Sequence, residues 1–183
     1  MPFTPFRSKS RSETRVRVVE ELLKQHEGSL IRYATRLLGF DVERARDVVQ
    51  EAFLRLCKQD DVEGLGREWL FTVTRRLCID VTRKESRMTT IEDEFAVGAP
   101  GPGGSLSMDD DSGVGAETGE NLSRAIHRLP ERQQEALRLK FESGLSYAEI
   151  AGVMETSAGN VGWILHTAIQ GLKARMTPEG GVR

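Results

Sequence analysis

The sequence predicts an all-α protein in which two small helical domains are joined by a flexible acidic linker. Apolar residues recur every three or four positions through most of the chain, which is the period of a helix and not of a strand. Residues 88–120 lose this period and hold eight acidic and no basic residues. Glycine and proline dominate their centre, from Gly98 to Gly104, which is a composition typical of a linker. The 183 residues leave room for two small domains.

The first domain is predicted over residues 16–87, after a basic tail, residues 1–15, that we expect to be disordered. Gly28 and Ser29 leave open a division of its first apolar stretch into two helices. Asp41 has the side chain of an N-cap for the next helix. The apolar stretches that predict helices run from Val16 to about Leu38, from Arg44 to Leu56 and from about Arg67 to Arg87.

The second domain is predicted over residues 121–177. We expect Asn121 to cap its first helix and Pro130 to lie in the first turn of the following one. The apolar positions of that second helix include Phe141. We therefore expect this domain, too, to be helical from its first residues.

The segment from Gly144 to Leu172 has the spacing of a helix-turn-helix. Ser146 followed by Glu149 forms a capping box at the start of a short helix. A turn of four residues separates it from a longer helix, which is the element that enters the DNA major groove in such motifs. The pattern alone also fits an ordinary short helical hairpin. The inner face of the longer helix is predicted to consist of Val161, Leu165 and Ala168.

Several classes of protein are excluded by what the sequence lacks. No nucleophile and base, carboxylate pair or phosphate-binding loop can be assembled, so we expect neither catalysis nor a cofactor. The three histidines have no ligand spacing, so no metal site is expected. Cys57 and Cys78 are interpreted as buried thiols of a reducing compartment. No apolar run approaches the ~20 residues of a membrane span, and the basic N-terminus has no apolar segment behind it, so neither membrane insertion nor a secretory signal is expected.

Both halves of the chain resemble the extracytoplasmic-function sigma factors. In the second half the resemblance rests on LPERQQEAL, from Leu129, and on GLSYAEIA, from Gly144, with the helix that follows. In the first half it rests on DVVQEAFLRL, from Asp47, and WLFTVTRRLCIDVTR, from Trp69. The resemblance implies a region 2-like domain at residues 16–87 and a region 4-like domain at residues 121–177.

The resemblance implies that the helix from Asp47 to Leu56 binds the beta-prime subunit of core RNA polymerase. Spacings of three and four residues place four of its side chains on one face. An acidic and amide face suits a basic partner surface. The predicted core-polymerase-binding residues are Asp47, Gln50, Glu51 and Leu54.

The following helix resembles the family's helix for reading and melting the −10 promoter element. Its basic residues form a stripe suited to phosphate contacts, and its aromatic residues Trp69 and Phe71 are candidates for stacking on unpaired bases. For Trp69, packing in the core is the competing interpretation. Arg76 stands where the family usually has Asn, so a different base preference is expected. The predicted −10 residues are Trp69, Arg75, Arg76, Arg83, Lys84 and Arg87.

The last helix resembles the family's −35 recognition helix but departs from it in charge. Between Ser157 and Gln170 it carries no Lys or Arg, so we expect weak binding to duplex DNA by this domain alone. An exposed patch of Trp163 and Ile164 for docking a protein is the alternative interpretation. The predicted −35 residues are Ser157, Asn160, Trp163 and His166.

The sequence thus predicts a cytoplasmic sigma factor that binds core RNA polymerase, through its beta-prime and beta subunits, and directs promoter recognition and opening. Promoter DNA and an anti-sigma protein are its other expected partners, the latter implied by the resemblance alone. Two alternatives stay open. One is a sigma-like adaptor that titrates an anti-sigma protein without reading DNA, and the other is a conventional helix-turn-helix regulator.

Overall fold

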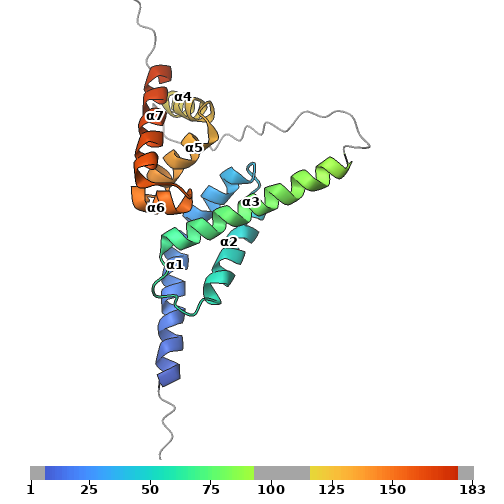
Figure 1. Cartoon of the computed structure of the whole chain (residues 1–183), viewed down its shortest axis with the longest axis vertical. Coiled ribbons are helices and arrows are strands. Elements are labelled where there is room, and N and C mark those ends of the chain that lie inside the picture. The colour runs from blue at the N-terminus through green and yellow to red at the C-terminus, as the bar shows by residue number, and fades with distance from the viewer. Residues whose placement is uncertain (1–6, 93–115, 177–183) are drawn as a thin grey trace, which may run out of the picture. The chain divides into compact units, whose positions relative to one another are not determined.

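The computed structural model describes residues 7–92 and 116–176, which divide between two compact units, Met1–Gly104 and Ser105–Arg183. The secondary structure of the described residues consists of helices joined by turns and contains no strand, as the apolar periodicity predicts. Figure 1 shows the helices, coloured in chain order. They are α1 (Arg7–Leu37), α2 (Val42–Cys57), α3 (Arg67–Glu92), α4 (Ala116–His127), α5 (Glu131–Leu137), the π-helical turn η1 (Arg138–Glu142), α6 (Tyr147–Val153) and α7 (Ala158–Met176).

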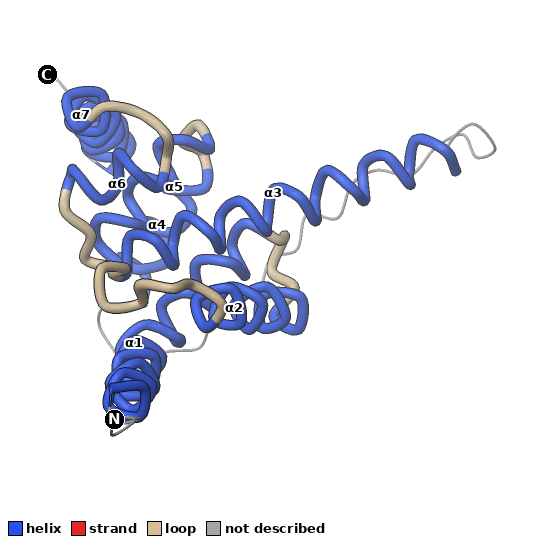
Figure 2. Tube along the Cα trace, turned by 60° about the horizontal axis from the view of Figure 1, so that its bottom comes forward, coloured by secondary structure: helices blue, strands red, loops and turns tan. Residues whose placement is uncertain are grey.

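In the N-terminal unit α1, α2 and α3 each pack against the other two, as their crossing in Figure 2 shows. Gly39 ends the first helix with a φ of +65°, which a residue without Cβ adopts easily. Asp41 then caps α2, since its side chain accepts a hydrogen bond of 3.0 Å from the backbone N–H of Arg44. An aromatic pair, Tyr33 and Phe71, joins α1 to α3 with ring centroids 5.4 Å apart. The core is mostly apolar and built mainly from the helices, with its largest fully buried side chains from Leu30, Tyr33, Leu56, Leu70 and Phe71.

The first helix is longer and less interrupted than predicted. It begins at Arg7, so residues 7–15 of the expected disordered tail are helical, and residues 1–6 lie outside the described part of the chain. Gly28 and Ser29 do not divide it. The Ser29 hydroxyl donates to the backbone carbonyl of His26, 2.9 Å away, and the helix continues.

Helices also extend into both ends of the predicted linker. Helix α3 continues to Glu92, and α4 begins at Ala116, so residues 93–115 are the part of that linker outside the described residues. Asn121 consequently lies inside α4 and is not its cap. Its side-chain oxygen accepts a hydrogen bond of 2.7 Å from Arg124.

In the C-terminal unit α7 packs against α4, α5 and α6. The π-helical turn η1 carries a backbone bond of 3.0 Å from Ser143 to Arg138, five residues earlier. This wider turn changes the phase of the helix, and Phe141, predicted among its apolar positions, is 67% exposed. Pro130 is the N-cap of α5, one residue before its first turn. The buried residues include Leu139, Leu145, Ile150, Val161 and Leu165.

The two cysteines differ in exposure. Cys78 is buried between the helices of the N-terminal unit, as predicted. Cys57 is the last residue of α2 and is exposed, so its prediction as a buried thiol is wrong. The apolar stripe of α2 ends one residue earlier, at Leu56.

Candidate functional site

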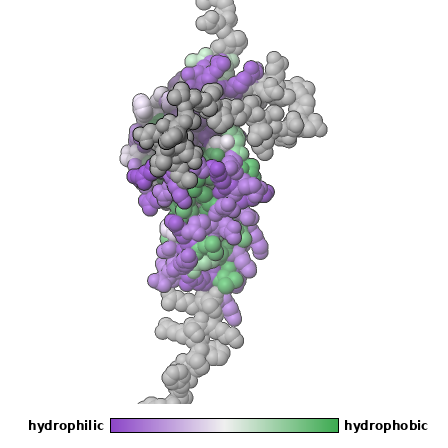
Figure 3. All heavy atoms as spheres, turned by 90° about the vertical axis from the view of Figure 1, so that its right-hand side faces the viewer, coloured by the Kyte–Doolittle hydropathy of each residue, from purple (hydrophilic) through white to green (hydrophobic). Residues whose placement is uncertain are grey.

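Helix α2 presents the predicted polymerase-binding residues on the side away from its core face. Its buried residues follow a regular helical spacing and end with Leu56. On the opposite side Asp47 and Gln50 are exposed, and Leu54 is 48% exposed. The face is therefore acidic and polar with one apolar side chain within reach of a partner. Figure 3 shows the same mixture more widely, with apolar side chains interspersed in a mostly hydrophilic surface.

The fourth residue of this face, Glu51, is held in its charged form. The Arg55 side chain donates a hydrogen bond of 2.8 Å to its carboxylate, one turn further along the helix. This bond lowers the pKa of Glu51 below its ordinary value, although desolvation acts in the opposite direction, and the charges of Arg55 and Lys58 lower it further. Glu51 therefore stays ionised over a wider pH range than an ordinary glutamate.

Helix α3 places most of its basic residues on the solvent side. Arg76, Arg83, Lys84 and Arg87 are exposed, while Arg75 is partly buried. Spacings of seven and eleven residues put Arg83 and Arg87 on the same side as Arg76. We refer to Arg76, Arg83, Lys84 and Arg87 as the basic stripe.

The aromatic residues at the start of α3 take different places. Trp69 is partly buried, so it contributes to packing and keeps part of its surface accessible. Phe71 is fully buried against Tyr33, so the prediction that it stacks on bases is wrong. It is buried because the core contacts a broad arc of α3, which also includes the neighbouring Leu70.

The helix-turn-helix of the C-terminal unit is formed as predicted from Gly144 to Leu172. The Ser146 hydroxyl accepts from the backbone of Glu149 at 3.3 Å, and the Glu149 carboxylate accepts from the backbone of Ser146 at 2.7 Å, which completes the capping box. Glu155, with a φ of 51°, makes the turn between α6 and α7. The two helices pack together through buried residues of both.

The predicted recognition residues lie at the start and on the outer face of α7. Trp163 is 63% exposed, and His166, one turn on, is also exposed. The Ser157 hydroxyl accepts from the backbone of Asn160 at 3.2 Å and so acts as the cap of α7. Asn160 is partly buried, and its amide nitrogen donates to the Thr156 hydroxyl at 2.8 Å.

The alternative apolar patch on α7 does not form. Ile164 is only 5% exposed, which leaves Trp163 without it. Helix α7 contacts three other helices, so its buried arc is wide enough to include Ile164. In the predicted recognition part of this helix, Trp163 is therefore an exposed large apolar side chain that stands without Ile164 beside it.

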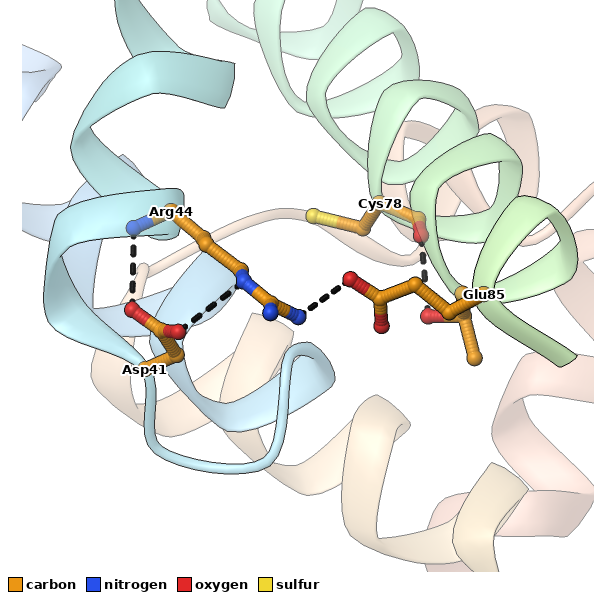
Figure 4. A network of polar contacts seen from close by, with 5 residues as sticks. Asp41, Arg44, Cys78 and Glu85 are labelled. Carbon is orange, nitrogen blue, oxygen red and sulfur yellow. Dashed lines mark hydrogen bonds and ion pairs between the residues drawn. The ribbon is translucent and has the colours of Figure 1, made fainter. Parts of the chain in front are cut away.

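Two arrangements were missed from the sequence. Near the helix-turn-helix, the Lys140 amine lies 5.3 Å from the centre of the Tyr147 ring and donates to the carbonyl of Leu145 at 3.2 Å. In the N-terminal unit, Arg44 of α2 contacts both Asp41 and Glu85 of α3, as Figure 4 shows. The first depends on the turn between η1 and α6, and the contact of Arg44 with Glu85 depends on how α2 and α3 cross, and helical spacing reports neither.

Among the residues that the structure describes, no group of histidine, cysteine or acidic side chains is arranged to hold a metal ion. The helices within residues 7–92 and 116–176 are also too short or too polar to span a membrane.

Comparison with known proteins decides the family. The family model for Sigma-70 region 2 matches residues 22–88, and the model for Sigma-70, region 4 matches residues 119–175. The chain is 30% identical to the ECF RNA polymerase sigma factor SigL of Mycobacterium tuberculosis over 171 residues, which cover 91% of this chain and 93% of SigL. The chain belongs to the extracytoplasmic-function (ECF) RNA polymerase sigma factors.

Further similarities agree with this assignment. This sigma factor is 28% identical over 160 residues to the ECF sigma factor SigM of Bacillus subtilis, covering 85% of this chain and 93% of SigM. Its fold is similar to that of the sigma factor RpoE from Bartonella quintana, with a TM-score of 0.59, 22% identity and coverage of 93% and 99% of the two chains. As a sigma factor it binds core RNA polymerase and directs promoter recognition and opening, while the chemistry of transcription belongs to the polymerase. The match to region 2 covers the N-terminal helices that a conventional helix-turn-helix regulator leaves unexplained.

Proposed function

We propose that this sigma factor binds core polymerase through one helix of its N-terminal unit and reads the −10 element through the next. The observation that carries the proposal is that α2 and α3 pack together while each keeps a distinct charged face exposed. The α2 face is acidic and the stripe on α3 is basic. One packed unit can therefore hold a protein and a nucleic acid at the same time. The polymerase contacts are Asp47, Gln50, Glu51 and Leu54, and the −10 contacts are Trp69, Arg75, Arg76, Arg83, Lys84 and Arg87.

The −35 element is read by the C-terminal unit in this proposal. The geometry of its helix-turn-helix presents the outer face of α7, which carries Ser157, Asn160, Trp163 and His166. An amide such as Asn160 can read adenine, and an apolar side chain such as Trp163 can contact a thymine methyl. Because this face has no Lys or Arg, phosphate contacts contribute little to its affinity.

The domain boundaries are proposed as residues 16–87 and 121–177, with the acidic linker, residues 88–120, between them. We propose that the sigma factor itself catalyses no reaction and acts in the cytoplasm, where core polymerase is found. An anti-sigma protein is proposed as a further partner, since the structurally similar RpoE was solved in complex with the anti-sigma factor NepR.

The experiment that tests the polymerase-binding face reverses two of its charges. The variant Asp47→Lys with Glu51→Lys should bind purified core polymerase about ten- to a hundredfold more weakly, because a basic partner surface then meets like charge. The matched control is Glu20→Lys with Glu27→Lys, two exposed glutamates on another helix, α1, whose reversal changes the net charge by the same amount. Equal affinity of both variants in a titration of labelled core polymerase, with helical content unchanged, would rule out this face.

A further inference from the structure

The C-terminal part of helix α3 extends beyond the three-helix bundle of the N-terminal unit. Between Arg67 and Arg87, where side-chain burial is described, the last buried side chain is that of Cys78, and Figures 1 and 2 both show the C-terminal part of the helix projecting past α1 and α2. From Thr82 to Arg87 every residue except the partly buried Glu85 is exposed. Three of the four residues of the basic stripe lie in this projecting part, so the apolar core does little to fix their direction.

A polar contact ties the projecting part back to α2. The Arg44 guanidinium, near the start of α2, donates from Nη1 to the Glu85 carboxylate. Its Nε lies 3.0 Å from the Asp41 carboxylate, which also accepts from the Arg44 backbone as the cap of α2. Figure 4 shows Arg44 between the two acidic side chains. The Arg44 side chain thus contacts the N-cap residue of α2 with one nitrogen and a residue of the projecting part of α3 with another.

We propose that Arg44 is a positioning residue that sets the direction of the basic stripe through its ion pair with Glu85. Nine residues separate Cys78 from Arg87, or about 14 Å at the rise of an α-helix. A tilt of about 10° at Cys78 therefore moves Arg87 by roughly 2 Å, which is enough to lose a phosphate contact. The pair also places a cation against Glu85, the one acidic residue between Arg83 and Arg87. This role rests on the proposed function of the basic stripe.

A contribution to stability alone does not account for such a contact. Both side chains are about half exposed, at 52% and 46%, and ion pairs of this kind add little to the stability of a fold. The geometry of the contact, in which one guanidinium bridges two carboxylates, is better suited to fixing a direction than to adding stability. A guanidinium can contact two carboxylates from different nitrogens at once, whereas a lysine amine is a single point and cannot replace both contacts in the same way.

The test compares Arg44→Gln, Arg44→Lys and Glu85→Gln in the full-length protein. Arg46→Gln is the matched control, because Arg46 is also an exposed arginine of α2 but pairs with Glu43 of the same helix, at 2.9 Å. Amide hydrogen exchange over residues 79–87 should be about two- to fivefold faster in the three variants and unchanged in the control. Promoter opening by the reconstituted holoenzyme should fall about tenfold in the three variants, with core binding unchanged.

The direction in which Glu85→Gln changes the rate of promoter opening separates the two explanations. It removes a negative charge from the basic stripe, so a purely electrostatic role predicts faster promoter opening, whereas positioning predicts slower opening. Faster opening by Glu85→Gln, or unchanged exchange over residues 79–87 in both Gln variants, would overturn the positioning role. Arg44→Lys keeps the charge, so slower opening in this variant supports the geometry of the contact. A parent holoenzyme that opens no promoter would instead contradict the proposed function, and the exchange measurement separates the two failures.

Discussion

At the scale of single residues, whether a side chain is buried or exposed depends on the helices around it and not on its residue type alone. Ile164 is buried although it lies outside the predicted inner face of α7, and Phe71 is buried although it was predicted to stack on bases. Cys57 is exposed although it follows an apolar stripe. Helical spacing gives the centre of a buried face, but its width depends on how many helices pack against it. The capping residues Asp41 and Ser146 could be predicted, because a cap involves only neighbours in the chain.

Glu51 should titrate below its ordinary pKa of 4.5, since its carboxylate accepts from Arg55. A lowered pKa in the folded state means that ionised Glu51 stabilises the fold above about pH 4.5, and that this contribution is lost as the pH falls through the lowered value. Arg55→Gln should raise the pKa toward the ordinary value. Carbon-13 NMR titration of the Glu51 carboxyl measures both. An unchanged titration in Arg55→Gln would show that Arg55 is not the cause.

Thr74 should be replaceable by valine with a gain in stability. Its side chain is fully buried in the N-terminal unit, and its hydroxyl has no hydrogen-bond partner. Removing an unsatisfied buried hydroxyl while keeping the shape should raise the free energy of unfolding by about 1 kcal/mol. Thr72→Val is the control, because the Thr72 hydroxyl donates to the carbonyl of Glu68 at 2.9 Å and its loss brings no such gain. Urea unfolding of both variants checks this, and a Thr74→Val protein that is less stable than the parent would contradict it.

At the scale of helices, the sequence predicted which elements form better than where they end. Helix α1 starts at Arg7 because a helix, once nucleated by its packed part, propagates through residues that have no apolar pattern of their own. Asn121 looks like a cap but lies inside α4, since asparagine is only weakly disfavoured there. Phe141 is exposed because η1 adds a wider turn that no residue type announces.

Helix α3, more than α7, should determine the salt dependence of promoter binding. The variant Arg83→Gln with Arg87→Gln removes two exposed basic residues of α3 and should lower the slope of log K against log salt by about two units. Lys24→Gln with Arg32→Gln, two exposed basic residues of α1, should leave the slope unchanged. The measurement is promoter binding by the holoenzyme over a series of salt concentrations. Equal slopes for the two variants would remove Arg83 and Arg87 from the DNA interface.

At the scale of the whole molecule, the all-α class and the division into two units could be predicted from the sequence. The period of the apolar residues specifies the class, and the loss of that period between two patterned stretches specifies the division. The candidate site was predicted residue by residue through resemblance, and the structure places most of those residues at the surface. The Arg44–Glu85 pair could not be predicted, because it joins positions 41 residues apart whose meeting depends on the crossing of α2 and α3.

The central claim is that this chain gives core polymerase its promoter specificity. Run-off transcription with purified core polymerase on a pool of genomic promoters tests it most directly. Core polymerase with the parent chain should produce transcripts from a defined subset of promoters, which core alone and core with the Asp47→Lys, Glu51→Lys variant should not. A chain that binds core polymerase or an anti-sigma protein but yields no promoter-specific transcript would contradict the claim and would identify a sigma-like adaptor instead.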